Sequence, residues 1–256
     1  MLPLLLAVYV PNAAAHAESE GVVLHEGYDY DSCYIDLHSE LTQDQFGRFA
    51  RKFMDTAPFL AMAGAESLGA GHVRLGLTYS QSFVDDAEPE WNNTFTHPGD
   101  DHWLGQPAIP MLSGRVGLPA KFDVELMGTS DLASNWGLGA AALRRVVLTQ
   151  SETMPVSLAA RASYEHLFGP PEVDVDGAAL EALVSHRFGP VSPYLGADVT
   201  ASLASEQTNE LSLDPALSFG GRGVVGTELN FGFFHASAQG TWASVPSVAL
   251  QVGGTI

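Results

Sequence analysis

Charge is scarce in this sequence, and most of it is negative. Charged residues make up 16% of the chain, whereas about 25% is typical of a soluble domain. Eleven basic residues oppose thirty acidic ones, which gives a formal net charge of −19. An acidic surface repels phosphate backbones, so nucleic acid is not expected as a partner. Solvated acidic loops are the simplest interpretation, and divalent cations bound at those loops are the alternative.

Cysteine is nearly absent. Cys33 is the only one, which excludes an intramolecular disulfide and a cysteine-rich zinc site. The sequence also lacks a Walker-type phosphate loop, a dinucleotide-binding fingerprint and an HExxH pattern. No cofactor is therefore predicted.

Long apolar runs are missing beyond residue 17, so a membrane-spanning helix is not predicted. The short apolar run at 2–10 is followed by the small-x-small pattern Ala15-His16-Ala17. This arrangement predicts a cleaved export signal at 1–17. A buried N-terminal helix is the alternative, and Pro3 and Pro11 argue against it.

Residues 18–66 are predicted to form an acidic arm and one amphipathic helix over about 42–57. Thr42 and Gln45 have the spacing of a capping box. The apolar stripe of the helix is formed by Phe46, Phe49, Phe53 and Ala57. Its basic surface is formed by Arg48, Arg51 and Lys52. Such a helix could lie on a membrane surface, or it could dock at or plug a barrel mouth, with its stripe as ordinary core. We expect 18–66 to be a periplasmic plug or mouth element.

From about residue 70 the hydrophobic period changes to two, which predicts β-strands. We expect a barrel over 67–256, most simply of ten strands, although eight or twelve remain open. The predicted strands are 72–83, 110–118, 121–130, 135–148, 155–168, 177–188, 193–205, 211–230, 232–243 and 246–256. Alternate connections are long and acidic, and those between them are tight turns. This asymmetry is typical of bacterial membrane barrels.

Charges within the predicted strands share one parity, and the opposite parity is nearly free of them. Charges facing lipid near the midplane would cost about 2–4 kcal/mol each, so we expect the charged face to line the lumen. The expected lumen network comprises Arg74, Arg115, Asp123, Glu125, Arg161, Glu165, Glu181, Arg187, Asp198, Arg222 and Glu228. Strand four is expected to turn Trp136, Leu138, Ala140 and Ala142 outward, and Arg144 is the exception expected to snorkel from the lipid face.

Three segments carry a family resemblance: SGRVGLPAKFDVELMGTS, PVSLAARASYEHLFG and LVSHRFGPVSPYLGADV. Their strand alternation, Phe-Gly turn and Pro-Tyr-x-Gly strand start resemble bacterial outer-membrane β-barrel proteins, nearest to uncharacterised barrel families. The resemblance covers about 67–256. It implies an all-β, antiparallel, up-and-down transmembrane barrel in the outer membrane of a Gram-negative bacterium, with membrane lipid and the barrel-insertion machinery as partners. Such proteins usually end in Phe, whereas Ile256 stands last here.

Two places could carry chemistry. Asp100, Asp101 and His102 lie in the long first loop, where hard carboxylate oxygens could bind a metal ion; a solvated acidic loop is the simpler interpretation. His166, near one end of strand five, is expected to face lipid beside Tyr164 and Phe168. A histidine there could support hydrolysis next to a serine, although a structural role is more common.

We therefore predict a non-enzymatic outer-membrane barrel with a structural or small-pore role and no catalytic residues. The alternatives are passage of a small or hydrophobic molecule, with the Phe-stripe helix as a plug, and a barrel hydrolase.

Overall fold

The computed structural model describes residues 34–85, 88–95, 108–130, 135–208 and 210–256. The chain forms α1 (Gln43–Thr56), β1 (Val73–Ser82), α2 (Pro89–Asn92), β2 (Ala108–Leu118), the 3₁₀ turn Pro119–Lys121, β3 (Phe122–Ser130), β4 (Gly137–Leu148), β5 (Ser157–Phe168), β6 (Val173–Ser185), β7 (Val191–Glu206), β8 (Ala216–Phe231), β9 (Phe234–Trp242) and β10 (Ser247–Thr255). The predicted signal segment 1–17 lies outside the described residues.

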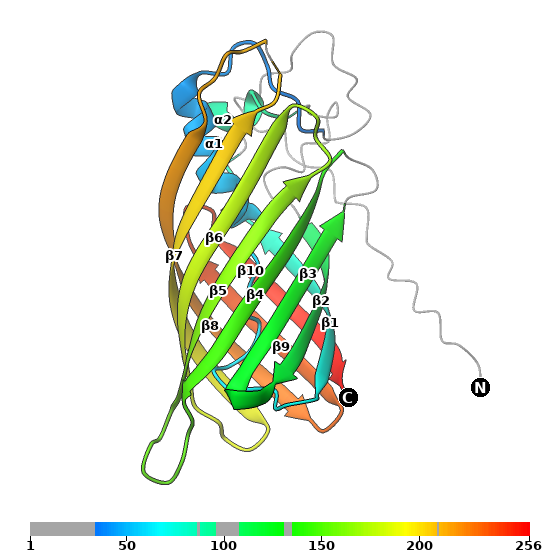
Figure 1. Cartoon of the computed structure of the whole chain (residues 1–256), viewed down its shortest axis with the longest axis vertical. Coiled ribbons are helices and arrows are strands. Elements are labelled where there is room, and N and C mark those ends of the chain that lie inside the picture. The colour runs from blue at the N-terminus through cyan, green and yellow to red at the C-terminus, as the bar shows by residue number, and fades with distance from the viewer. Residues whose placement is uncertain (1–33, 86–87, 96–107, 131–134, 209) are drawn as a thin grey trace, which may run out of the picture.

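The ten strands close into one antiparallel barrel (Figure 1). Each strand pairs with its sequence neighbours, and β10 completes the ring by pairing with β1 from Ser82↔Ser247 to Arg74↔Thr255. Because the ring is closed, no strand of the barrel has an unpaired edge. The predicted all-β, up-and-down barrel of ten strands is confirmed.

Large apolar side chains cover the outside of the barrel. Leu112, Leu180 and Phe219 are 70%, 65% and 71% exposed. The belt continues around the ring with Leu75, Leu126, Leu195, Val199, Leu217, Val225 and Leu250. A water-soluble protein would bury most of these side chains, each burial being worth about 1.5–3 kcal/mol. The outer surface is therefore suited to lipid. Within the described residues, no helix combines the length and apolarity that crossing a bilayer requires.

The faces of β4 are opposite to those predicted. Leu138 and Arg144 are fully buried, whereas Leu143 and Arg145 are exposed on the outer wall. Arg144 is therefore a lumen residue, and the outward cation of this strand is its neighbour Arg145. The prediction failed because apolar side chains were taken to mark the lipid side, but at this level the interior of the barrel is itself apolar.

That apolar interior surrounds α1, which lies in the upper mouth of the barrel against β7 and β8. The predicted capping box at its start, Thr42 with Gln45, is present. Phe49 packs against Trp91 at 6.1 Å, and Phe53 packs against Trp136 at 5.9 Å, both edge to face. Of the two interpretations of the helix, the structure favours docking in the mouth, with the Phe stripe as core.

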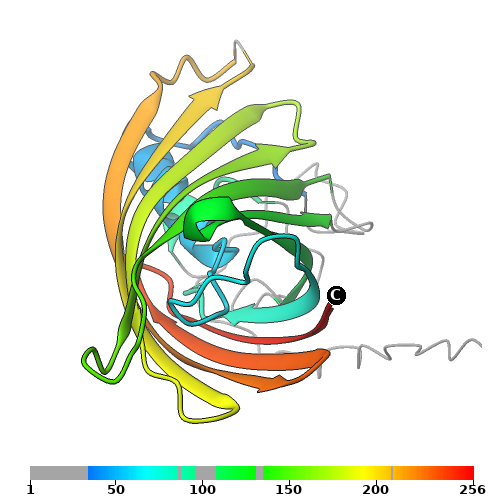
Figure 2. The ribbon, with the colours of Figure 1, turned by 60° about the horizontal axis from the view of Figure 1, so that its bottom comes forward.

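The helix lies at the end that carries the long connections, among them 83–107, and not at the end with the tight turns. The periplasmic position expected for 18–66 stays a prediction; the long loops of bacterial barrels typically face the exterior. After Thr56 the chain runs down the inside of the ring and reaches β1 at the opposite end (Figure 2). We call residues 57–68 the lumen segment.

Candidate functional sites: a filled lumen and a histidine–aspartate cluster

Glu125 on β3 is the centre of the charge network inside the barrel. Its two oxygens face three guanidinium groups, with Nε of Arg144 at 2.9 Å, Nε of Arg161 at 2.8 Å and Nε of Arg115 at 3.8 Å. All four side chains are buried. A buried charge is tolerated only when it is paired and hydrogen-bonded, and here the strand register supplies the partners, because Arg115 stands opposite Glu125 across β2 and β3.

Further ion pairs extend the network along the lumen. Arg222 Nε lies 2.8 Å from Asp198 Oδ2, and its Nη1 lies 4.0 Å from Glu165 Oε1. The remaining pairs are Arg161–Glu181 at 3.3 Å, Arg115–Asp123 at 2.7 Å and Arg74–Glu228 at 2.5 Å. Most of these pairs join neighbouring strands, whereas Arg74–Glu228 and Arg222–Glu165 join strands that are not neighbours in the ring.

The lumen segment lies among these charges and uses them as hydrogen-bond partners. Arg161 Nη1 donates to the Phe59 carbonyl at 3.1 Å, and its guanidinium carbon lies 4.3 Å from the centre of the Phe59 ring. Arg144 Nη1 donates to the Gly64 carbonyl at 2.8 Å. In return, Glu228 accepts from the Gly64 amide at 3.0 Å. Irregular backbone inside a membrane protein needs such partners, and the network provides them.

Little space remains beside the middle of the lumen segment, residues 59–63, whereas an open pocket of about 670 Å³ borders its last residues, Glu66 and Ser67, at the turn end. A cavity of about 30 Å³ lies between the segment and the wall formed by Arg74, Arg115 and Glu125. That volume holds about one water molecule.

Ten of the eleven residues expected in the lumen network lie within the barrel, and Arg187 does not. Arg187 follows β6 in the turn 186–190, its side chain is 52% exposed, and it pairs with Glu66. The network instead contains Arg144, which was assigned to the lipid face. Its signal was the dipeptide Arg144-Arg145, of which a strand must turn one side chain inward.

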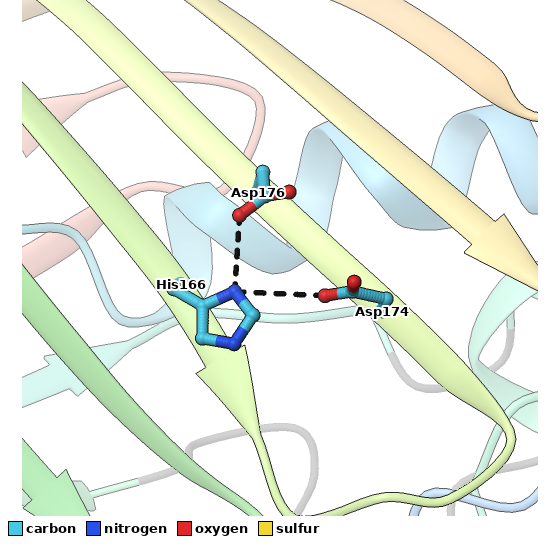
Figure 3. A group of neighbouring side chains, drawn as sticks. All are labelled: His166, Asp174 and Asp176. Atoms are coloured by element: carbon cyan, nitrogen blue, oxygen red, sulfur yellow. Dashed lines mark hydrogen bonds and ion pairs between the residues drawn. The ribbon is translucent and has the colours of Figure 1, made fainter.

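The second candidate site lies on the outer wall near the long-loop end (Figure 3). His166 on β5 stands opposite Asp176 on β6, with Asp174 two positions further along β6. His166 Nδ1 lies 3.0 Å from Asp176 Oδ1 and 3.5 Å from Asp174 Oδ1. The Tyr164 hydroxyl donates a hydrogen bond to Asp176 Oδ1. One potential ligand atom from each of His166, Asp174 and Asp176 lies within 4.8 Å of the other two.

This cluster was not expected as a unit. His166 has the predicted outward direction, but 169–176 was assigned to an acidic loop, whereas β6 begins at Val173. Alternation in Val173-Asp174-Val175-Asp176, with both valines buried, was the available signal. The earlier candidates Asp100, Asp101 and His102 lie outside the described residues.

Ionic contacts also hold the mouth of the barrel. Lys52 on α1 pairs with Glu88 and Glu90 beside α2. Burial would raise the pKa of Glu90, but hydrogen bonds from Lys52 and Arg48 lower it below its ordinary value. Asp55 accepts from the Ser244 hydroxyl at 2.5 Å, and burial raises the pKa of this carboxyl.

A closed antiparallel barrel with an apolar exterior and paired charges inside defines an outer-membrane β-barrel protein. Among solved structures, the chain resembles the attachment invasion locus protein Ail of Yersinia pestis (15% identity, 73% of this chain and 99% of that chain covered, TM-score 0.32). It also resembles Neisserial surface protein A (13%, 72% and 95%, TM-score 0.32) and a loop-deletion mutant of OmpT, an outer-membrane protein of Vibrio cholerae (11%, 88% and 74%, TM-score 0.33).

At these values the likeness carries no inference about activity, and the class assignment rests on the barrel itself. No protein-family model matches the chain. No curated protein matches it in sequence.

Proposed function

We propose that this protein is a non-enzymatic outer-membrane barrel with a closed lumen and a structural role. The observation that carries the proposal is the lumen segment, whose backbone is hydrogen-bonded to Arg144, Arg161 and Glu228 inside the ring. An open pore needs a continuous water-filled path. Beside residues 59–63 of the segment, the cavity of about 30 Å³ is far smaller than such a path.

A second function is passage of a small molecule after the lumen segment moves. Its support is the polar character of the contacts that hold the segment. Guanidinium and carboxylate groups that release the segment would be solvated by the water that replaces it. The free-energy cost of releasing the segment is therefore smaller than the cost of exposing an apolar core to water.

Conductance across planar bilayers with a lockable lumen segment distinguishes the two functions. A Cβ built on Gly64 would lie 3.1 Å from the Cβ of Ser185, slightly shorter than the range of about 3.5–4.5 Å that is usual in a disulfide. The double variant Gly64→Cys with Ser185→Cys, in a Cys33→Ser background, therefore tethers the segment to β6 after a small shift. A bacterial porin in the same bilayers shows that the assay detects channels.

We expect the wild type, the oxidised variant and the reduced variant all to be silent. Conductance steps in the wild type and the reduced variant, lost on oxidation, would replace the structural role with gated passage. Steps that persist in the oxidised variant would contradict closure by the segment.

Hydrolysis beside His166 has less support. The groups that contact its Nδ1 are the carboxylates of Asp174 and Asp176, not a serine hydroxyl. If the barrel cleaves lipid esters, His166→Ala should abolish the cleavage of vesicle phospholipid; we expect no cleavage by the wild type.

A further inference from the structure

The His166–Asp174–Asp176 cluster differs from the carboxylates of the lumen network in how its charge is balanced. Each buried carboxylate of the lumen network has a guanidinium partner. In the described part of the chain, neither Asp174 nor Asp176 forms an ion pair with lysine or arginine; their only ionic contact is His166. One imidazole cannot neutralise two carboxylates, so the cluster keeps a net negative charge.

An unsatisfied atom points to what could supply the missing charge. The Asp174 side chain is 45% exposed, but its Oδ1 is shielded from solvent and accepts no hydrogen bond from the described residues. It faces His166 Nδ1 at 3.5 Å, too far for a good hydrogen bond. An oxygen that has no donor among the described residues and lies beside two other ligand atoms is suited to a cation placed between them (Figure 3).

The supporting structure holds these groups in place. The alternate side chains of β6, Val173 and Val175, are buried on the inner face, which directs both aspartates outward. The Tyr164 hydroxyl donates to Asp176 Oδ1 and orients that carboxylate. A partner that orients a metal-binding carboxylate in this way commonly raises affinity 10–100-fold.

We propose that His166, Asp174 and Asp176 bind one divalent transition-metal ion on the outer wall, with Zn²⁺ as the best fit. An imidazole nitrogen with carboxylate oxygens favours Zn²⁺ over Mg²⁺ or Ca²⁺, which prefer all-oxygen ligands. Nδ1 is the coordinating nitrogen, since it faces both carboxylates. Three protein ligands leave at least one position for water or for an anionic group near the membrane boundary.

The test is titration of the full chain, folded in detergent without a histidine tag, with Zn²⁺ by calorimetry and with Co²⁺ by visible absorption. Wild type should bind Zn²⁺ at this site, and Co²⁺ should give a d–d spectrum that Zn²⁺ abolishes. His166→Ala and Asp176→Asn should each weaken Zn²⁺ binding at least tenfold, and Tyr164→Phe should weaken it about tenfold. A tenfold excess of Mg²⁺ should not displace Zn²⁺.

Matched controls separate the cluster from nonspecific binding and from the first loop. His72→Ala and Glu152→Gln remove a histidine and a carboxylate from exposed positions at the opposite end, before β1 and between β4 and β5, and they should leave the affinity unchanged. The triple variant Asp100→Asn, Asp101→Asn, His102→Ala should also retain the site.

Equal Zn²⁺ affinity in wild type, His166→Ala and Asp176→Asn would overturn the proposal, as would loss of binding in the triple variant alone. The heat-dependent mobility of each variant in SDS checks that its barrel is folded. Asp174→Asn replaces any variant that fails this check.

Discussion

Arg144 and Arg145 are adjacent in sequence and opposite in environment. Arg144 is fully buried and bound to Glu125 and the Gly64 carbonyl, whereas Arg145 lies outside over the Phe122 ring at 5.2 Å. Removing one partner of a buried ion pair leaves the other charge without compensation, which typically costs about 3–5 kcal/mol. Loss of an exposed cation–π contact costs about 0.5–1 kcal/mol.

We therefore expect Arg144→Ala to destabilise the barrel strongly and Arg145→Ala to have little effect. Urea unfolding in lipid vesicles, followed by tryptophan fluorescence, measures both. Similar losses for the two variants would contradict the inward direction of Arg144.

Asp36 and Glu172 form an acidic contact outside the barrel wall. Glu172 Oε2 accepts from the Leu37 amide at 2.7 Å. Burial raises the pKa of both carboxyls. The charge of Asp36 adds to the rise in the pKa of Glu172, and the charge of Glu210 adds to the rise in the pKa of Asp36, which its hydrogen bond with Glu172 partly offsets. A raised folded-state pKa means that docking is favoured while the pair holds a proton.

Docking of residues 36–37 should accordingly be strongest at pH values below the ordinary pKa of the two carboxyls, 3.8 for Asp36 and 4.5 for Glu172. It should weaken as the pH rises through their raised folded-state pKa values. Hydrogen exchange of the Leu37 amide between pH 4 and 8, corrected for the intrinsic rate, measures this. Glu172→Gln keeps the acceptor but removes the charge, so the part of the pH dependence that Glu172 contributes should disappear, while Asp36 continues to titrate. An unchanged slope in that variant would exclude the carboxyl pair as its source.

At the scale of the element, α1 is held by its Phe stripe rather than by its own propensity. Phe49 is fully buried among Phe53, Trp91 and Phe95. A buried Phe→Ala change costs about 3–5 kcal/mol, and the loss should fall on docking because α1 is not part of the barrel wall.

We expect Phe49→Ala to accelerate exchange of the α1 amides while the barrel keeps its heat-dependent mobility in SDS. Phe219→Ala, on the lipid-facing wall, is the control and should leave α1 protected. Loss of the barrel in Phe49→Ala would instead make α1 part of its folding core.

The sequence predicts the two faces of a strand reliably only where one face meets lipid and the other meets a polar interior. The strands in the lower barrel have lipid on one side and charges on the other, so alternation predicts both the strand and its faces, as for Asp123 and Glu125 on β3. Around α1 the interior is apolar, and β4 consequently offers apolar side chains on both faces. The His166 cluster forms because β6 begins at Val173. The sequence does not reveal this start, because the acidic residues Asp174 and Asp176 are typical of a loop.

On the scale of the whole molecule, the barrel depends on lipid around its wall. Leu180, 65% exposed near the middle of β6, should not tolerate charge. Leu180→Arg should cost about 2–4 kcal/mol in a bilayer, whereas Leu217→Arg near the long-loop end should cost about 0–1 kcal/mol. Urea titration in vesicles compares the two. Equal costs would indicate water around the wall.

The position of the lumen segment also restricts the order of assembly. The seam of the ring joins β1 to β10, so the wall cannot close before the last strand is present. The segment directly precedes β1, and α1 lies at its other end. Inserting both into a finished ring would require drawing a helix past crowded guanidinium groups. The ring must therefore close around α1 and the lumen segment while both are already in place. The N-terminal part of the chain then acts as an internal template for the barrel.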